Sequence, residues 1–391
     1  PCMTTPREDD VIRWLDGQLP RMLALLEKLV NTDSGSFDKA GVDACGQVLI
    51  DFLAAEGLDI EVTPVATHGD VIHARHAVPA ATARRPIVLR GHRDTVCPKG
   101  EPTRRPFTIE NGVARGPGVM DMKGGLVMNA FVIAALKRHD ASPAPVTMMI
   151  TSDEEIASPA CRPHIEAEAR GARMVFNSEP SREPHSIVKG RKGGVFMALD
   201  VVGKASHSGA NHHEGVSAIQ ALALKIPALH ALTDDRRGIT VNVGLVSGGQ
   251  TVNTVAPWAR GEIDLRYVGA PDRADAVAAI QAIADRVDLP GTTATLTIRG
   301  EFLPLEETPA SARLFEIYRE AGRIAGFETG AEFTGGCADS GFTSAQGCPT
   351  LCSVGPVGGK GHTPEEYLLV DSLVPSAKAL ALAVMRAGAE G

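Results

Sequence analysis

The stretch Pro145-Val146-Thr147-Met148-Met149-Ile150-Thr151-Ser152-Asp153-Glu154-Glu155 joins an apolar run of strand type to three consecutive acids. Adjacent carboxylates repel one another unless a positive charge lies beside them. A divalent metal would neutralise one of them and leave its neighbour free for proton transfer. The same residues also allow a solvated turn that opens a helix, because acids are favoured near a helix N-terminus. The triplet alone favours that turn, so a metal is expected only if other segments supply further ligands.

Length and composition limit the class of protein. A chain of 391 residues is too long for one typical core and predicts two domains. Its hydrophobic content of 43%, charged content of 22% and net charge of -8 are those of a globular protein without a nucleic-acid surface. No stretch approaches the length of a membrane span. The seven cysteines show no Cys-x-x-Cys spacing, so we expect a reduced, cytoplasmic protein without a thiolate zinc site.

Strands alternate with helices in the first part of the chain. After helical segments at about 12–30 and 41–56, the pattern predicts strands at 87–90, 146–151 and 174–177 and a helix at 124–138. This alternation predicts an α/β sheet with helices on both faces. The same style returns after Pro304, with a helix at 311–325, a strand at 350–354 and a helix at 372–387.

A different pattern begins near Pro184. Longer alternating strands are predicted at 195–202, 239–246, 261–268 and 293–299, with helices at 216–231 and 273–287. This strand-helix-strand-strand-helix-strand order fits a four-stranded antiparallel, ferredoxin-like α+β domain. We therefore expect a discontinuous α/β domain at 1–183 and 299–391, interrupted by an inserted domain at 184–298.

His92 and Asp94 follow the predicted strand at 87–90. Residues i and i+2 of a strand point to the same side, so an imidazole and a carboxylate would face one cavity. The carboxyl end of a strand is where α/β proteins place their sites. A lone His-x-Asp is more often plain surface, and its position at a strand end leaves both interpretations open.

Three further residues could supply oxygen or nitrogen ligands. Asp121 lies between a glycine-rich turn and a predicted helix, Glu179 follows the strand at 174–177, and His362 lies in a glycine-rich loop. Asp121 could instead cap the helix, and His362 could be a solvated loop residue. Two histidines and several carboxylates without thiolates favour a catalytic zinc, manganese or cobalt centre over a structural zinc site.

The order of five segments resembles the cocatalytic dizinc peptidase and aminoacylase family, which includes acetylornithine deacetylases, succinyl-diaminopimelate desuccinylases and glutamate carboxypeptidases. The segments are His92-x-Asp94, Gly118-x-x-Asp121-x-Lys123-Gly124-Gly125, Asp153-Glu154-Glu155, Ser178-Glu179-Pro180 and His362. The resemblance covers nearly the whole chain and is closest to the glutamate carboxypeptidases. It implies a zinc-peptidase-like catalytic domain, with a mixed sheet flanked by helices, and an inserted lid and dimerisation domain.

The resemblance also implies a set of metal ligands. Asp121 would bridge two divalent metal ions, for which zinc is the first choice and cobalt or manganese the alternatives. His92 and Glu179 would complete one metal site, and Glu155 and His362 would complete the other.

Three more residues would act in the reaction. Glu154 would be the general base. Asp94 would orient His92 by fixing its tautomer. His207, in a loop of small residues in the insert, would donate to the developing oxyanion, often from the partner subunit of a dimer. A loop histidine that faces solvent is the alternative for His207.

We expect substrate to contact Arg266, Asn253, Lys192 and Gly336. The Arg266 guanidinium suits a free carboxylate, although a salt bridge to Asp264 or Glu262 is an equal alternative. Lys192 would contact an anionic group of the substrate.

These assignments predict hydrolysis of an amide bond whose nitrogen side is an amino acid with a free carboxylate. Removal of a C-terminal glutamate is the leading case. An N-acyl-amino-acid deacylase of the acetylornithine deacetylase or desuccinylase type, or a dipeptidase, is the alternative. A noncatalytic metal-binding scaffold is remote, because it would not need Glu154. The expected partners are a small-molecule or peptide substrate and a second copy of the chain, and neither nucleic acid nor a membrane is expected.

Overall fold

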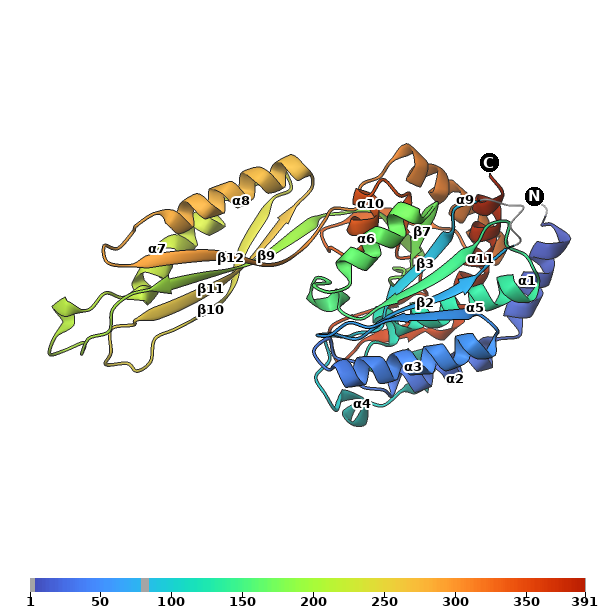
Figure 1. The fold of residues 1–391 in the computed structure, drawn as a ribbon, viewed down its shortest axis with the longest axis horizontal. Helices are drawn as coiled ribbons and strands as arrows, with labels where there is room; N and C mark the ends of the chain where they lie inside the picture. The colour runs from blue at the N-terminus through green and yellow to red at the C-terminus, as the bar shows by residue number, and fades with distance from the viewer. Residues whose placement is uncertain (1–3, 79–83, 391) are drawn as a thin grey trace. The chain divides into compact units, whose positions relative to one another are not determined.

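The computed structural model describes residues 4–78 and 84–390, and it divides into two compact units (Figure 1). Unit 1 comprises Pro1–Gly190, Leu305–Phe333 and Phe342–Gly391, and unit 2 comprises Arg191–Pro304 and Thr334–Gly341. Unit 2 therefore takes in a short segment close to the C-terminal part of the chain, which lies outside the insert predicted at 184–298.

A mixed sheet of eight strands forms the centre of unit 1, in the order β1-β2-β6-β3-β7-β14-β8-β13. The inner strands β6, β3, β7 and β14 run parallel, whereas β1, β2 and β8 pair antiparallel with their neighbours. The predicted α/β class with a mixed sheet is confirmed. The strands are β1 (Asp59–Thr63), β2 (Val71–His76), β3 (Ile87–His92), β6 (Val146–Thr151), β7 (Met174–Asn177), β8 (Ser186–Arg191), β13 (Gly330–Thr334) and β14 (Thr350–Cys352).

Helices flank this sheet (Figure 1). The central helix α5 (Gly124–Arg138) packs against β3 and β6, and every residue from 124 to 136 is buried. A helix that is apolar on all sides is stable only when it is surrounded by protein, and α5 is covered by α2 (Leu19–Val30) and α11 (Leu373–Ala389). The other helices are α1 (Pro6–Asp16), α2 (Leu19–Val30), α3 (Lys39–Ala55), α4 (Glu101–Arg104), α6 (Arg162–Gly171), α9 (Pro309–Ala325), α10 (Ser340–Ala345) and α11 (Leu373–Ala389).

Within the described residues, the segment Val119–Arg138 is long and apolar enough to cross a membrane. The expectation that no stretch approaches this length is therefore wrong. Of its apolar window, 94% is buried inside the molecule, as is typical of the core helix of a globular protein.

A small second sheet in unit 1 joins β4 (Thr108–Glu110) and β5 (Val113–Arg115) to β15 (Gly358–Gly359) and β16 (Tyr367–Leu369). The loop between β15 and β16 carries His362. The pairing of β16 with β5 brings this late loop to the segment that precedes α5, where Asp121 lies.

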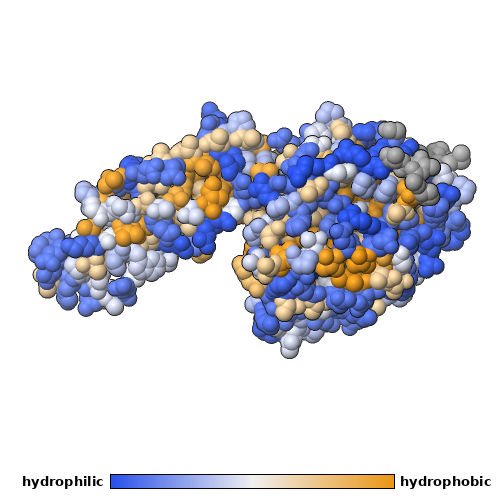
Figure 2. Space-filling model, viewed as in Figure 1, coloured by the Kyte–Doolittle hydropathy of each residue, from blue (hydrophilic) through white to orange (hydrophobic). Residues whose placement is uncertain are grey.

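Unit 2 is an antiparallel sheet of four strands in the order β10-β11-β9-β12, with α7 and α8 packed against it (Figure 1). Its elements are β9 (Gly193–Val202), α7 (Ala218–His230), β10 (Thr240–Gly248), β11 (Trp258–Tyr267), α8 (Ala270–Asp285) and β12 (Thr293–Phe302). The strand and helix order is the ferredoxin-like one predicted. Hydrophilic and apolar residues are interspersed on the visible surface (Figure 2), and Leu245 and Val246 on the edge strand β10 are 64% and 56% exposed.

Candidate metal centre

The parallel register brings the ends of three strands to one edge of the sheet. His92 lies opposite Thr151 in the β3–β6 pair, and Arg90 lies opposite Asn177 in the β3–β7 pair. Because parallel strands end at the same edge, the residues at the ends of β3, β6 and β7 and just after them become neighbours. His92, the acidic triplet and Glu179 are brought together in this way.

His92 is fully buried and faces several carboxylates. Its Nδ1 lies 3.0 Å from the backbone carbonyl oxygen of Asp94, so a neutral ring that donates there has its lone pair on Nε2. Nε2 lies 3.4 Å from Asp121 Oδ1, 3.5 Å from Glu179 Oε1 and 3.8 Å from Glu154 Oε2. Burial lowers the pKa of His92, but Glu179, Asp121 and Asp94 raise it well above its ordinary value. The surroundings are therefore strongly negative and would stabilise a cation.

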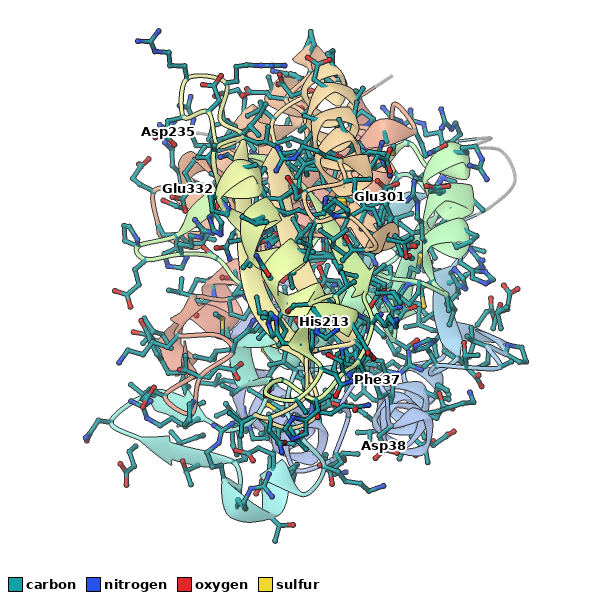
Figure 3. All side chains as sticks on the ribbon, turned by 90° about the vertical axis from the view of Figure 1, so that its left-hand side faces the viewer. Phe37, Asp38, His213, Asp235, Glu301 and Glu332 are labelled. Carbon is teal, nitrogen blue, oxygen red and sulfur yellow. The ribbon has the colours of Figure 1, made fainter. Side chains whose placement is uncertain are left out.

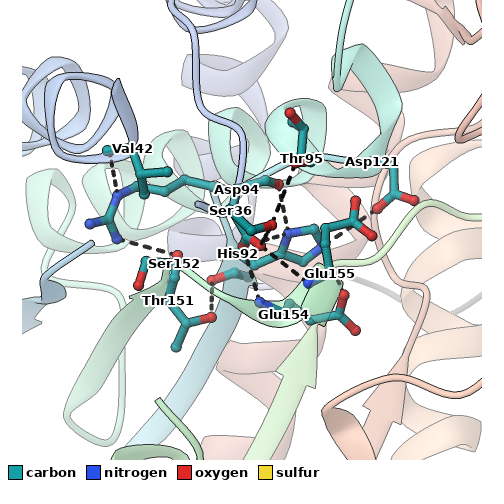
Figure 4. Close-up of polar contacts among 12 residues, drawn as sticks. Ser36, Val42, His92, Asp94, Thr95, Asp121, Thr151, Ser152, Glu154 and Glu155 are labelled. Atoms are coloured by element: carbon teal, nitrogen blue, oxygen red, sulfur yellow. Dashed lines mark hydrogen bonds and ion pairs between the residues drawn. The ribbon is translucent and has the colours of Figure 1, made fainter. Parts of the chain in front are cut away.

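The buried Asp94 carboxylate connects three segments of the chain (Figure 4). It accepts hydrogen bonds from the backbone N–H groups of Glu154 and Glu155, at 3.1 and 3.2 Å, and from Ser36 Oγ at 2.7 Å. Its Oδ1 also lies 3.3 Å from His92 Nδ1. Asp94 thus contacts His92 and also positions the backbone of two glutamates, which the sequence did not predict.

The loop that carries Asp121 is held by a second buried carboxylate. Gly118 adopts a left-handed conformation, with φ of 69°, and the backbone of Asp121 leaves helical geometry, with φ of -113° and ψ of 89°. Glu366 accepts hydrogen bonds from the backbone N–H groups of Gly118, Met120 and Asp121 at 3.0, 3.0 and 3.1 Å. These three bonds satisfy donors that a helix start would otherwise leave open.

His362 adopts a left-handed conformation, with φ of 64°, in the loop between β15 and β16. Its Nε2 lies 3.1 Å from Glu155 Oε2 and 3.3 Å from Asp121 Oδ2. Hydrogen bonds with Asp121 and Glu155 raise the pKa of His362 to about 10. Burial and repulsion from Asp121 raise the pKa of Glu155 to about 7. This side of the site is open, since the His362 side chain is 56% exposed.

Two groups of three ligand atoms share Asp121. One is His92, Asp121 and Glu179, and the other is Asp121, Glu155 and His362; within each group the atoms lie within 4.8 Å of one another. His92 Nε2 and Glu155 Oε1 are buried atoms that make no hydrogen bond. Imidazole nitrogens and carboxylate oxygens suit zinc, manganese and cobalt. These residues fit divalent metal ions and could hold two of them.

The three acids of the triplet occupy different environments. Asp153 accepts backbone hydrogen bonds from Ala160 and Cys161, at 2.7 and 3.1 Å, just before α6. The Glu155 carboxylate contacts the His362 imidazole. Glu154 is buried and belongs to neither of the two ligand groups that share Asp121. The repulsion expected for adjacent acids is thus reduced for Asp153 and Glu155, whose side chains contact different partners.

In unit 2, His207 is an exposed residue with a defined tautomer. Its Nδ1 accepts hydrogen bonds from the backbone N–H groups of Gly209 and Ala210, both at 3.1 Å. A neutral ring therefore carries its proton on Nε2 and can donate from that atom. Asn253 is close by, because its backbone carbonyl accepts a hydrogen bond from Ser208 N–H at 2.9 Å.

Arg266 makes the salt bridge that was its predicted alternative role. Its Nε donates to Asp264 Oδ1 at 2.8 Å, and its Nη1 contacts Cys337 Sγ at 2.7 Å. Gly336 precedes Cys337, and the backbone N–H of Lys192 donates to the Thr334 carbonyl at 3.1 Å. Arg266, Lys192 and Gly336 therefore lie in one region of unit 2, around the start of β9.

The predicted substrate residues of unit 2 form two separate groups. Arg266 pairs with Gly194 near the start of β9, whereas His207 and Asn253 lie beyond Val202, where β9 ends. At about 3.3 Å per residue, the eight steps from Gly194 to Val202 span about 26 Å. The sheet of one chain therefore does not bring Arg266 and His207 together.

Sequence reasoning missed Ser36 and Glu366. Ser36 carries no local signal, because a serine in a loop has many possible partners. The available signal for Glu366 was an acid four residues after His362 in a glycine-rich loop. Its partners, at Gly118 to Asp121, follow only from the pairing of β16 with β5.

Comparisons with known proteins place this geometry in context. Residues 88–386 match the model of peptidase family M20/M25/M40. The chain is 27% identical over 384 residues to carboxypeptidase G2 of Pseudomonas sp. (strain RS-16), covering 96% of this chain and 91% of the relative. It is 27% identical over 405 residues to acetylornithine deacetylase of Edwardsiella ictaluri, and this match covers 93% of this chain and 96% of the relative. The solved structure of an M20 family metallo-carboxypeptidase from Sulfolobus solfataricus has the same fold, with a TM-score of 0.78 and 18% identity. The match covers 93% of this chain and 98% of that chain.

Proposed function

The chain belongs to peptidase family M20/M25/M40 and is a metallo-hydrolase, and we propose that it cleaves an amide bond to release an amino acid with a free carboxylate. Removal of a C-terminal glutamate is the leading case, supported by the similarity to carboxypeptidase G2. The observation that supports hydrolysis most strongly is the pair of ligand groups that share Asp121, with Glu154 Oε2 beside them at 3.8 Å from His92 Nε2.

We assign the metal ligands from these groups. His92, Asp121 and Glu179 would hold one divalent ion, and Asp121, Glu155 and His362 the other. Bound divalent ions lower the pKa of a water molecule and polarise a carbonyl oxygen. Zinc is the proposed metal, with cobalt or manganese as alternatives, because the donors are imidazoles and carboxylates.

Glu154 is proposed as the general base. Its side chain is buried, and its Oε2 lies 3.8 Å from His92 Nε2, beside the ligand groups. Its backbone is held by Asp94, so the carboxylate has a defined place from which to take a proton and pass it to the leaving nitrogen. Asp94 would orient His92 through the contacts at Nδ1.

Residues of unit 2 are proposed to bind the rest of the substrate. Arg266, Lys192 and Gly336 would bind the free carboxylate of the released amino acid, and the Arg266 guanidinium has the donor geometry for it. His207 would donate from Nε2 to the developing oxyanion, with Asn253 beside it.

We propose that the enzyme is a homodimer through unit 2. A substrate of one or two residues cannot contact both Arg266 and His207 of one chain, because these residues flank opposite ends of β9, where Gly194 and Val202 are about 26 Å apart. A second copy that supplies His207 would complete the site. The edge strand β10, with Leu245 and Val246 exposed, offers open backbone groups and apolar area for such an association.

There are two alternatives to this proposed function. An N-acyl-amino-acid deacylase would use the same catalytic residues on a smaller acyl group, and the similarity to acetylornithine deacetylase supports it; a dipeptidase is a further variant. A noncatalytic scaffold would leave Glu154 without a role. The cytoplasm is the proposed location.

A substrate panel tests this proposal. N-acyl-glutamates, other N-acyl amino acids and dipeptides are incubated with the zinc-loaded protein, with and without a chelator, and released amino acid is measured. We expect chelator-sensitive hydrolysis that Glu154→Gln reduces by about 10²–10⁴-fold while metal content stays the same. Near-normal turnover of Glu154→Gln would remove the general-base assignment, and no hydrolysis of any panel member would favour the scaffold.

A further inference from the structure

Unit 1 contains a cavity of about 600 Å³ that the proposed reaction leaves without a role. The segments 35–38 and 95–99 line it, together with Glu155 and Ile156. Glu155 belongs to one of the two ligand groups, so the cavity adjoins the candidate metal centre. Its volume is that of a typical small-molecule site.

The two segments that line this cavity are held firmly to each other. Ser36 Oγ donates to Asp94 Oδ2 at 2.7 Å, and Ser36 N–H donates to the Thr95 carbonyl at 3.3 Å. The backbones approach so closely at Gly35 that a Cβ there would lie 2.7 Å from the carbonyl oxygen of Cys97. The cavity is therefore formed by defined backbone rather than by a loose loop.

Apolar side chains are presented on these segments. Phe37 is 83% exposed although its neighbour Ser36 is buried, and Phe37 and Asp38 are labelled in Figure 3. Val96, 46% exposed, lines the same cavity from the other segment, and Pro98 and Ile156 add further apolar area. Apolar side chains gathered at one cavity indicate a binding surface more strongly than scattered ones do.

The charges at the cavity disfavour an anionic occupant. The structure describes all residues that line the cavity, and Lys99 is the one positively charged side chain among them. Its Nζ lies 3.0 Å from Asp38 Oδ2, so its charge is already paired. The remaining carboxylate of the lining, Glu155, belongs to one of the two ligand groups. A free carboxylate would find no uncompensated positive side chain here, whereas a neutral apolar group would be accommodated.

We propose that this cavity, the Phe37 pocket, binds an aromatic or branched apolar group on the carbonyl side of the scissile amide. The inference rests on the proposed function, which assigns the carboxylate-bearing side to Arg266 and Lys192. Because an acetyl group would fill only a small part of the pocket, the enzyme prefers substrates with a bulky acyl part over acetylated ones.

The test compares N-benzoyl and N-acetyl derivatives of the amino acid that the wild type releases fastest. Phe37→Ala lowers kcat/KM for the benzoyl compound by about tenfold and changes the acetyl compound by less than about twofold. Phe37→Leu retains part of the benzoyl preference. Ile109→Ala is the matched control, since Ile109 is an exposed apolar residue of unit 1, 43% exposed, outside the pocket.

A binding measurement keeps this test separate from the proposed function. Calorimetric titration of the zinc-loaded Glu154→Gln protein gives a Kd for each compound, and adding Phe37→Ala raises the benzoyl value by about tenfold. An equal loss for both compounds, or no loss, overturns the Phe37 pocket while amide hydrolysis stands. If the wild type cleaves no compound, the proposed function fails. The Phe37 pocket is then tested only by the effect of Phe37→Ala on the Kd values of the benzoyl and acetyl compounds.

Discussion

The carboxylate of Asp94 accepts a hydrogen bond from the backbone N–H of Glu154 at 3.1 Å. Its second oxygen accepts one from Glu155 at 3.2 Å, while its first oxygen lies 3.3 Å from His92 Nδ1. One buried side chain thus connects a proposed metal ligand to the backbone of the proposed base. The proposed proton-transfer group and the proposed metal ligands are therefore positioned together.

Asp94→Asn should weaken metal binding and reduce turnover together. The amide has one oxygen instead of two, so at least one backbone N–H of the two glutamates loses its acceptor. We expect metal affinity to fall about 10–100-fold, as for other residues that orient a ligand. Competition titration with a chelating dye measures this change. Asp153→Asn is the control for the loss of a negative charge, because both of its backbone N–H bonds, at Ala160 and Cys161, go to one oxygen that an asparagine can keep. Equal loss in both variants would mean that Asp94 acts through its charge rather than through its two hydrogen bonds.

Glu366→Gln should disturb the Asp121 loop. Three backbone N–H groups share its two oxygens, and an amide nitrogen cannot accept any of them. A buried donor without an acceptor costs about 1–3 kcal/mol, so thermal unfolding of unit 1 should occur at lower temperature and zinc should bind more weakly. Glu365→Gln is the matched control, since Glu365 is the exposed neighbour. Wild-type zinc affinity in Glu366→Gln would rule out this positioning role.

Complementation between inactive variants should reveal the origin of His207. Glu154→Gln and His207→Ala are each expected to be nearly inactive alone. In a mixed dimer, one catalytic unit keeps Glu154 and receives His207 from the other chain, so random re-association should restore about a quarter of wild-type activity. Activity is measured after co-refolding or co-expression. If the mixture shows only the sum of its components, His207 acts within its own chain or not at all.

Removal of metal should destabilise unit 1 selectively. Three carboxylates lie close together beside His92 in a largely buried place, those of Asp121, Glu155 and Glu179. A bound cation offsets the repulsion between them. Ligand binding at a thousand times its Kd stabilises the folded state by about 4 kcal/mol. In calorimetric scans, added zinc should therefore raise the unfolding temperature of unit 1 and leave that of unit 2 unchanged. His362→Ala should show a smaller shift, and an identical scan for both zinc conditions would contradict two bound ions.

Local pattern was sufficient for much of the fold. The apolar run at 146–151 and the largely apolar helix at 124–138 are identified by composition alone, because their burial requires no other information. The strand and helix order of the insert was likewise predictable from alternation. Proposed ligands at strand ends, such as His92 and Glu179, could be found because parallel strands bring their carboxyl ends together in any such sheet.

Relationships between distant segments depend on how the whole chain packs. Glu366 holds the loop at Asp121 because β16 pairs with β5, and no local pattern encodes which donors a loop acid will meet. The place of Thr334–Gly341 in unit 2 brings Cys337 against Arg266, and the length of β9 separates Arg266 from His207. Residue types and their order along the chain were enough to identify which side chains have the chemistry of a metal hydrolase. Their distances depend on backbone paths set by the whole packed chain, and these only the tertiary structure supplies.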